Sequence, residues 1–262
     1  MRLYEFASKP LLEGGNVFKN ADGEVVTTRI ARADIAPTLK WLESITGLPL
    51  VNNTLGSVGK KESSGDLDIA VDQNSVSKDD LVNKLSSWIT GQGENPKEWV
   101  KKSGISVHFK TPIKGDSANG FVQTDFMFGD DVEQMKFGLF AAGDTSRFSG
   151  ADRNLLMSSL AKSIPGDFKY SWQKGLIKRS TSEPISKNPD EIAKVLLGKA
   201  ANKNDLDSIE TMIAALKKNP SRIKDLENLI VALRSSEGKK PSDAKSDADE
   251  ADRITTALAA ID

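Results

Sequence analysis

Two aspartates stand where their carboxylates could act together. Asp66 and Asp68 are separated by one apolar residue at the start of the run 66–71. In a β-strand alternate side chains point to the same face, so both acids would share one face while Leu67 and Ile69 enter the core. Neighbouring carboxylates repel each other, and hard divalent cations such as Mg²⁺ prefer oxygen ligands. The spacing therefore indicates a cation site.

A third acid completes this candidate site. Asp125 lies in the middle of the apolar and aromatic run 121–128, which is predicted to be a buried strand. A charge in a core strand is costly unless a partner compensates it. A neighbouring strand that carries Asp66 and Asp68 around a metal would supply that partner, so we expect the three carboxylates to meet.

The elements that must position these acids are predicted from periodicity. Apolar residues recur at helical spacing over 34–46, with Asp34 as the expected N-cap. Ser77 and Asp80 resemble a capping box that begins a second helix.

Strands are predicted from alternation and from apolar runs. The stretch 104–113 alternates as a half-exposed strand does, while 50–55 and 66–71 are predicted as two core strands. Together with 121–128, these strands and helices indicate an α/β fold with a mixed sheet.

The Gly56-Ser57 pair, the gap of eight residues that follows it, the Asp66-Leu67-Asp68 element and the later Asp125 form one ordered pattern. This pattern resembles the DNA polymerase β-type nucleotidyltransferase superfamily over roughly residues 35 to 130. The resemblance implies a nucleotidyltransferase palm whose aspartates hold two Mg²⁺ or Mn²⁺ ions about 3.5–4 Å apart. Such an enzyme transfers a nucleoside monophosphate from an NTP to a hydroxyl and releases pyrophosphate. The resemblance also implies that Asp125 binds only the ion that activates the nucleophile.

The loop before Asp66 is the candidate phosphate site. A glycine lets backbone N–H groups approach an anion, and a serine hydroxyl adds a donor, so Gly56 and Ser57 are expected to cradle the triphosphate. Lys60 and Lys61 lie in the same loop. They could pair with phosphates, or they could be ordinary solvated lysines.

A basic segment follows the third carboxylate. Residues 153–179 hold six basic residues and one acid, interleaved with three aromatic residues. Basic and stacking side chains suit a nucleotide base and a phosphate backbone, which favours RNA, such as a tRNA 3′ end, as the acceptor. By resemblance, Arg153, Asn154 and Lys162 are candidates for nucleotide binding. An amphipathic helix and an edge strand with ordinary lysines would account for the segment equally well.

The predicted domain order is a palm over 1–145, an all-helical domain over 146–234 and a tail over 235–262. Most of the tail is rich in Ser, Asp, Lys and Ala with few apolar residues, which predicts a flexible segment with at most a short terminal helix.

Composition limits the class of protein. The chain has 262 residues, a formal net charge of −1 and no cysteine, which excludes thiol catalysis and zinc–cysteine sites. It has no apolar run of membrane-spanning length and no signal-peptide pattern at its start. We therefore expect a soluble cytoplasmic protein without membrane contact. Residues 1–8 resemble proteins of large tailed bacteriophages, which would place it in the host cytoplasm.

Other functions are compatible with the same residues. The transfer chemistry could act on a protein, a small molecule or another nucleotide, as in a toxin-like or signalling enzyme. A non-catalytic nucleic-acid-binding or virion-associated protein could keep the fold without turnover. The single histidine, His108, lies on the alternating strand and is interpreted as a surface or hydrogen-bonded residue rather than a ligand. The sequence does not indicate an oligomeric state.

Overall fold

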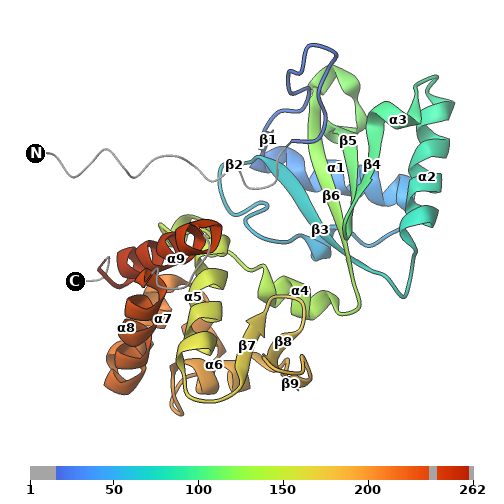
Figure 1. The fold of residues 1–262 in the computed structure, drawn as a ribbon. Helices are drawn as coiled ribbons and strands as arrows, with labels where there is room; N and C mark the ends of the chain where they lie inside the picture. Colours follow the sequence, from blue (N-terminus) through green and yellow to red (C-terminus); the bar gives the residue numbers. More distant parts are fainter. Residues whose placement is uncertain (1–15, 236–240, 260–262) are drawn as a thin grey trace, which may run out of the picture.

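The computed structural model describes residues 16–235 and 241–259, which form two parts (Figure 1). The first contains a sheet with helices against it, and the second, from α5 (Gly150–Ser163) onward, is mainly helical. No helix within these described ranges is both long and apolar enough to traverse a bilayer. Predictions for 1–15, including the bacteriophage resemblance, and for 236–240 and 260–262 lie outside the described residues.

The first part is built on a four-stranded mixed sheet. Its strand order is β3-β6-β5-β4, with β3 parallel to β6 and the other pairs antiparallel. The strands are β3 (Asp66–Asp72), β4 (Val100–Ser103), β5 (Ser106–Pro112) and β6 (Phe121–Gly129). This confirms the α/β class with a mixed sheet.

The predicted core strand over 50–55 is wrong. Residues Val51–Asn53 form a 3-10 turn, and only Thr54 bridges to Ile69 of β3. Asn52 and Asn53 account for the difference, because asparagine side chains compete for backbone hydrogen bonds and favour turns over strands.

Helices α1 (Arg32–Thr46), α2 (Lys78–Gly91) and α3 (Pro96–Trp99) belong to the same part, together with a small ribbon of β1 (Ile30–Ala31) and β2 (Ser63–Ser64). The predicted capping box is confirmed, because the Ser77 side chain accepts from the Asp80 N–H and the Asp80 carboxylate accepts from the Ser77 N–H. Asp34 is not the N-cap of α1. It lies in the first turn and pairs with Lys114 at 2.6 Å.

The two faces of the sheet differ. Leu67 and Ile69 of β3 and Phe126 of β6 are fully buried in one core with side chains of α1 and α2. On the opposite face, α4 (Val132–Gly138) covers the far end of β3, where Met135 packs against Ala70. The near end of that face carries the three aspartates.

The second part packs five helices around its own core: α5 (Gly150–Ser163), α6 (Pro189–Leu197), α7 (Ile209–Lys217), α8 (Pro220–Arg234) and α9 (Pro241–Ala259). The all-helical prediction is wrong, because β7 (Phe168–Ser171), β8 (Gly175–Lys178) and β9 (Pro184–Ser186) form an antiparallel sheet. Tyr170 and Leu176 face each other across its first pair and are buried in the helical core. The edge strand that the sequence analysis allowed within 153–179 corresponds to β7 and β8, whereas β9 was not predicted.

The prediction of a flexible tail over 235–262 is wrong for residues 241–259, which form helix α9. Ala251, Ile254 and Ala257 recur every three residues and are at most 2% exposed. They form one face that packs against α8 and α5 (Figure 1). Alanine has the highest helix propensity and lets helices approach closely, so a segment with few large apolar residues still docks.

Candidate metal centre

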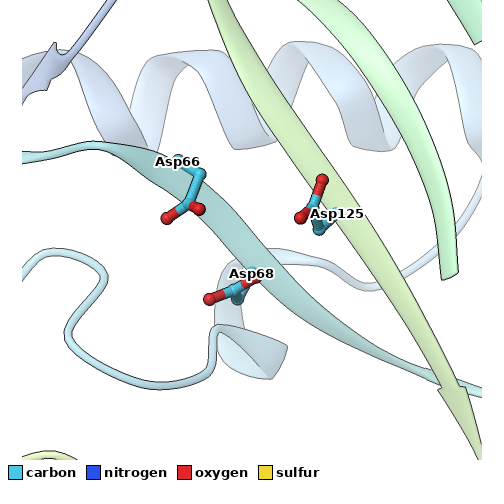
Figure 2. Close-up of side chains that lie close together, drawn as sticks. All are labelled: Asp66, Asp68 and Asp125. Atoms are coloured by element: carbon cyan, nitrogen blue, oxygen red, sulfur yellow. The ribbon is translucent and has the colours of Figure 1, made fainter. Parts of the chain in front are cut away.

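Asp66, Asp68 and Asp125 converge on one face of the sheet. Asp68 of β3 is directly opposite Asp125 of β6 in the parallel register, and Asp66 lies two residues earlier on the same face. One carboxylate oxygen from each residue lies within 4.8 Å of the others. Figure 2 shows the three side chains on the side of the sheet away from α1.

The donor set fits a hard divalent cation. All three ligands are carboxylates, which are the oxygen ligands that Mg²⁺ and Mn²⁺ take in proteins. Asp66 and Asp68 are half-buried and Asp125 is only 8% exposed. Like charges this close and this shielded from water repel each other strongly, so the arrangement is compensated best by a cation among them.

Asp125 is held from two sides. Its Oδ1 lies 2.7 Å from Nδ1 of His108, and its Oδ2 accepts a hydrogen bond of 3.2 Å from Nε2 of Gln123. His108 is the register partner of Asp125 on β5. The sequence interpretation of His108 as a hydrogen-bonded residue agrees with this contact, but its partner could not be identified without the strand order. Gln123 was missed, although it stands two residues before Asp125 on the same face.

The Gly56-Ser57 turn lies beside the aspartates. The Leu55 N–H donates to the Asp68 carbonyl at 2.8 Å, which ties the turn to β3. Gly56 has a positive φ of 59°, and a Cβ placed on it would lie 3.9 Å from Asp68 Oδ2. Among the described residues, no group accepts a hydrogen bond from the N–H of Gly56 or Ser57. The turn thus presents two backbone donors next to the acids.

Lys60 points out of this loop toward the segment between α4 and α5. Its Nζ donates to the Ala141 carbonyl at 2.7 Å and lies 3.9 Å from the centre of the Phe140 ring. Burial, followed by the positive charge of Arg153, lowers the pKa of the Lys60 ammonium. Lys61 is exposed, and its carbonyl accepts from Arg32 Nε at 2.8 Å.

Arg29 is another basic residue at the loop that the sequence interpretation missed. Its guanidinium donates to both the hydroxyl and the carbonyl of Ser63. A Cβ placed on Gly65, the residue before Asp66, would lie 3.3 Å from Nη1 of Arg29. The side chain therefore fixes the end of the loop at the start of β3.

The three candidates on α5 lie away from the aspartates, and two of them have partners in α4 or in the second part. Arg153 is 2% exposed and donates to the carbonyls of Leu206 and Phe137. Lys162 pairs with Glu250 of α9 at 3.4 Å. Asn154 is half-buried on the same helix. These contacts do not include the aspartates, so the structure does not bring Arg153 and Lys162 into the metal centre.

Comparison with known proteins adds no family assignment to this geometry. No protein-family model matches the chain, and no curated protein or solved structure matches it. The resemblance to the polymerase β-type enzymes therefore depends on the residues described above and on their arrangement.

Proposed function

We propose that the first part is a nucleotidyltransferase palm of the polymerase β type. In this proposal the protein transfers a nucleoside monophosphate from an NTP to a hydroxyl in a reaction that depends on Mg²⁺ or Mn²⁺. The observation that carries the proposal is the convergence of Asp66, Asp68 and Asp125 from adjacent parallel strands. The adjacent Gly56-Ser57 turn supports it, because a phosphate-binding turn belongs beside the metal ligands of such a site.

The residues have distinct roles in this reaction. Asp66, Asp68 and Asp125 would hold the cations, which when bound supply positive charge to the phosphates and lower the pKa of the attacking hydroxyl. The N–H groups of Gly56 and Ser57 would donate to the triphosphate. Preorganised donors of this kind stabilise negative charge as it develops in the transition state.

The bond changes are those of an in-line displacement. The acceptor oxygen forms a bond to the α-phosphorus while the bond from the α-phosphorus to the pyrophosphate oxygen breaks. The proton of the acceptor hydroxyl passes to the carboxylate of Asp125, and pyrophosphate leaves. The strands hold the ligands in place, so little reorganisation is needed when the substrates bind.

RNA is the acceptor indicated by the basic segment after Asp125, but its contacts weaken that choice. Arg153 donates to one carbonyl of the second part and one of α4, and Lys162 and Lys178 pair with acids of the second part. Arg179 donates to carbonyls at the end of α5. Tyr170 is buried in the helical core. Most of the side chains that would grip a phosphate backbone are therefore engaged elsewhere.

These contacts favour a second candidate with the same chemistry. In it, the acceptor is a small molecule, a nucleotide or a protein hydroxyl, which needs no extended basic surface. Lys169 and Lys174 are exposed, and two lysines alone are a small electrostatic footprint for a polynucleotide.

Transfer of label from NTPs tests the proposal. The protein is incubated with each α-labelled NTP, Mg²⁺ or Mn²⁺, and a pool of tRNA, oligonucleotides and small hydroxyl compounds. We expect metal-dependent label on one acceptor class and release of pyrophosphate. Label on RNA identifies the first acceptor, and label on a small molecule or on protein identifies the second.

A matched control makes the same Asp→Asn substitution outside the aspartate cluster. Asp68→Asn should abolish the transfer, whereas Asp130→Asn, which removes an exposed acid just after β6, should retain it. If the folded wild-type protein labels no acceptor under any of these conditions, the transferase proposal is wrong. A gel shift with RNA in that case would indicate a binding protein instead.

A further inference from the structure

His108 and Gln123 surround Asp125, and neither belongs to the proposed ligand set. The three side chains lie on the same face of the sheet, where Asp68, Asp125 and His108 form one row across β3, β6 and β5. The side chains of His108 and Asp125 are only 12% and 11% exposed. Their hydrogen bond is therefore largely shielded from water, which makes it stronger than the same bond at the surface.

The donor atoms can be assigned from the network. An ionised carboxylate only accepts hydrogen bonds, so the Nδ1 atom that lies 2.7 Å from Asp125 carries the proton. The Val17 N–H donates to Gln123 Oε1 at 2.9 Å, which turns the Nε2 of Gln123 toward Asp125. Each oxygen of Asp125 thus receives one donor from outside the cluster of aspartates.

We propose that His108, with Gln123 as a weaker second support, is a positioning residue for the metal ligand Asp125. This inference rests on the proposed function, because it assigns a role at the same metal site. A carboxylate oxygen can accept two hydrogen bonds, so one bond to each oxygen leaves acceptor capacity on both for a cation. The two donors fix the rotation of the Asp125 side chain. The remaining lone pairs of its carboxylate are thereby kept on the side of Asp66 and Asp68.

The two supports differ in strength. The His108 contact is 2.7 Å long and comes from a neighbouring strand, while the Gln123 contact is 3.2 Å long and comes from the same strand. Groups that orient metal ligands in this way typically change metal affinity by about 10–100-fold when they are removed. We expect the larger share of that effect from His108.

Mn²⁺ affinity tests this role without any need for turnover. Mn²⁺ is titrated into the protein, and free Mn²⁺ is measured by its electron paramagnetic resonance signal. His108→Leu should weaken binding by about 10–100-fold. His108→Asn should restore most of the affinity, because the asparagine amide nitrogen can occupy the place of Nδ1 and donate to Asp125. Ser106→Ala, which alters the same face of β5 two residues away, should leave affinity unchanged.

The outcomes separate this inference from the proposed function. If the wild type binds Mn²⁺ and Asp66→Ala abolishes binding, while both His108 variants bind as the wild type does, the positioning role is wrong and the metal site stands. If His108→Asn loses as much affinity as His108→Leu, the donated hydrogen bond is not what His108 contributes, and the inference is also overturned. If the wild type binds no Mn²⁺, both proposals fail.

Discussion

Carboxylates are placed differently in the two parts of the molecule. In the second part Asp152 lies beside Arg253 and Glu250 lies beside Lys162. In the first part Asp66, Asp68 and Asp125 lie beside one another.

This difference separates acids that are arranged for stability from acids that are arranged for function. A carboxylate beside a cation lowers the free energy of the folded state or costs little. Three carboxylates grouped together raise it, and a local conflict of this kind is typical of a functional site. The predictions below compare the two arrangements, from the largest expected effect to the smallest.

The aspartate cluster should be needed for activity and not for folding. Replacement of Asp66 and Asp68 by alanine together should reduce NMP transfer by at least about a thousandfold, because metal ions contribute several kcal/mol of charge stabilisation. The free energy of unfolding should stay the same or increase, since the repulsion among the acids is relieved. Label transfer and urea denaturation measure the two effects.

The control for this pair is Asp130→Asn, which should change neither quantity. If the double variant unfolds at much lower urea concentration than the wild type, the acids have a structural role, and the contrast between the two parts of the molecule does not hold.

The buried cation of the second part should show the opposite behaviour. Arg153→Met should lower the free energy of unfolding by about 3 kcal/mol, because the carbonyls of Leu206 and Phe137 lose their donor in a buried site. The KM for the NTP should not change. Lys162→Met, on the same helix but with a more exposed ion pair, should cost less than about 1 kcal/mol. If Arg153→Met instead raises the KM for the NTP without lowering the free energy of unfolding, Arg153 contributes to nucleotide binding.

The cluster of aspartates could be predicted because it depends on local rules. Alternation puts Asp66 and Asp68 on one face, and the buried strand around Asp125 demands a partner. The register that sets Asp125 opposite Asp68 and beside His108 depends on the order β3-β6-β5, and no local pattern specifies which strands become neighbours.

Arg153 shows a signal for burial that the sequence already contained. It begins the series of buried positions on α5 that continues through Leu156, Met157 and Leu160. This spacing is typical of the face of a helix that packs against the core. It therefore predicts that residue 153 is buried even though its side chain is charged. The amino-acid type favoured nucleotide binding, while the periodicity favoured the core.

Tyr170 should make the second part sensitive to alkaline pH. Burial raises the pKa of its hydroxyl to about 12, and the positive charge of Arg153 opposes this rise only in part. Below pH 10 both the folded and the unfolded tyrosine are protonated, and folding is not affected. Between pH 10 and about 12 the unfolded chain ionises first, so the folded state should lose roughly 3 kcal/mol relative to the unfolded state.

Comparison with Tyr170→Phe isolates this effect, because other groups also ionise at high pH. The stability of the wild type, relative to that of the variant, should fall as the pH rises from 10 to 12 in denaturation experiments. Tyrosinate absorbance near 295 nm, taken as the difference between wild type and variant, gives the titration curve of Tyr170 directly. Parallel stability curves for the two proteins would show that the buried hydroxyl titrates at its ordinary pKa.

Lys60 connects the loop before β3 to the linker, residues 139–149 between α4 and α5, and its replacement should have the smallest effect. Its ammonium donates to Ala141 and lies over Phe140, and a Cβ on Gly143 would come within 2.6 Å of the Lys60 Cβ, so the loop and the linker are closely packed. Lys60→Met keeps the apolar stem and should cost about 1 kcal/mol of stability through the lost hydrogen bond.

Lys61→Met is the matched control, since Lys61 is the next residue in the loop and is exposed. It should leave the free energy of unfolding unchanged. If Lys60 connects the loop to the linker, its replacement lowers stability and leaves the KM for the NTP as it was. If Lys60 instead turns to the triphosphate when substrate binds, KM rises while stability holds, because the hydrogen bond to Ala141 then contributes little to the folded state. The two variants together decide whether the basic residues of this loop belong with the charges that stabilise the second part or with those that serve the aspartate cluster.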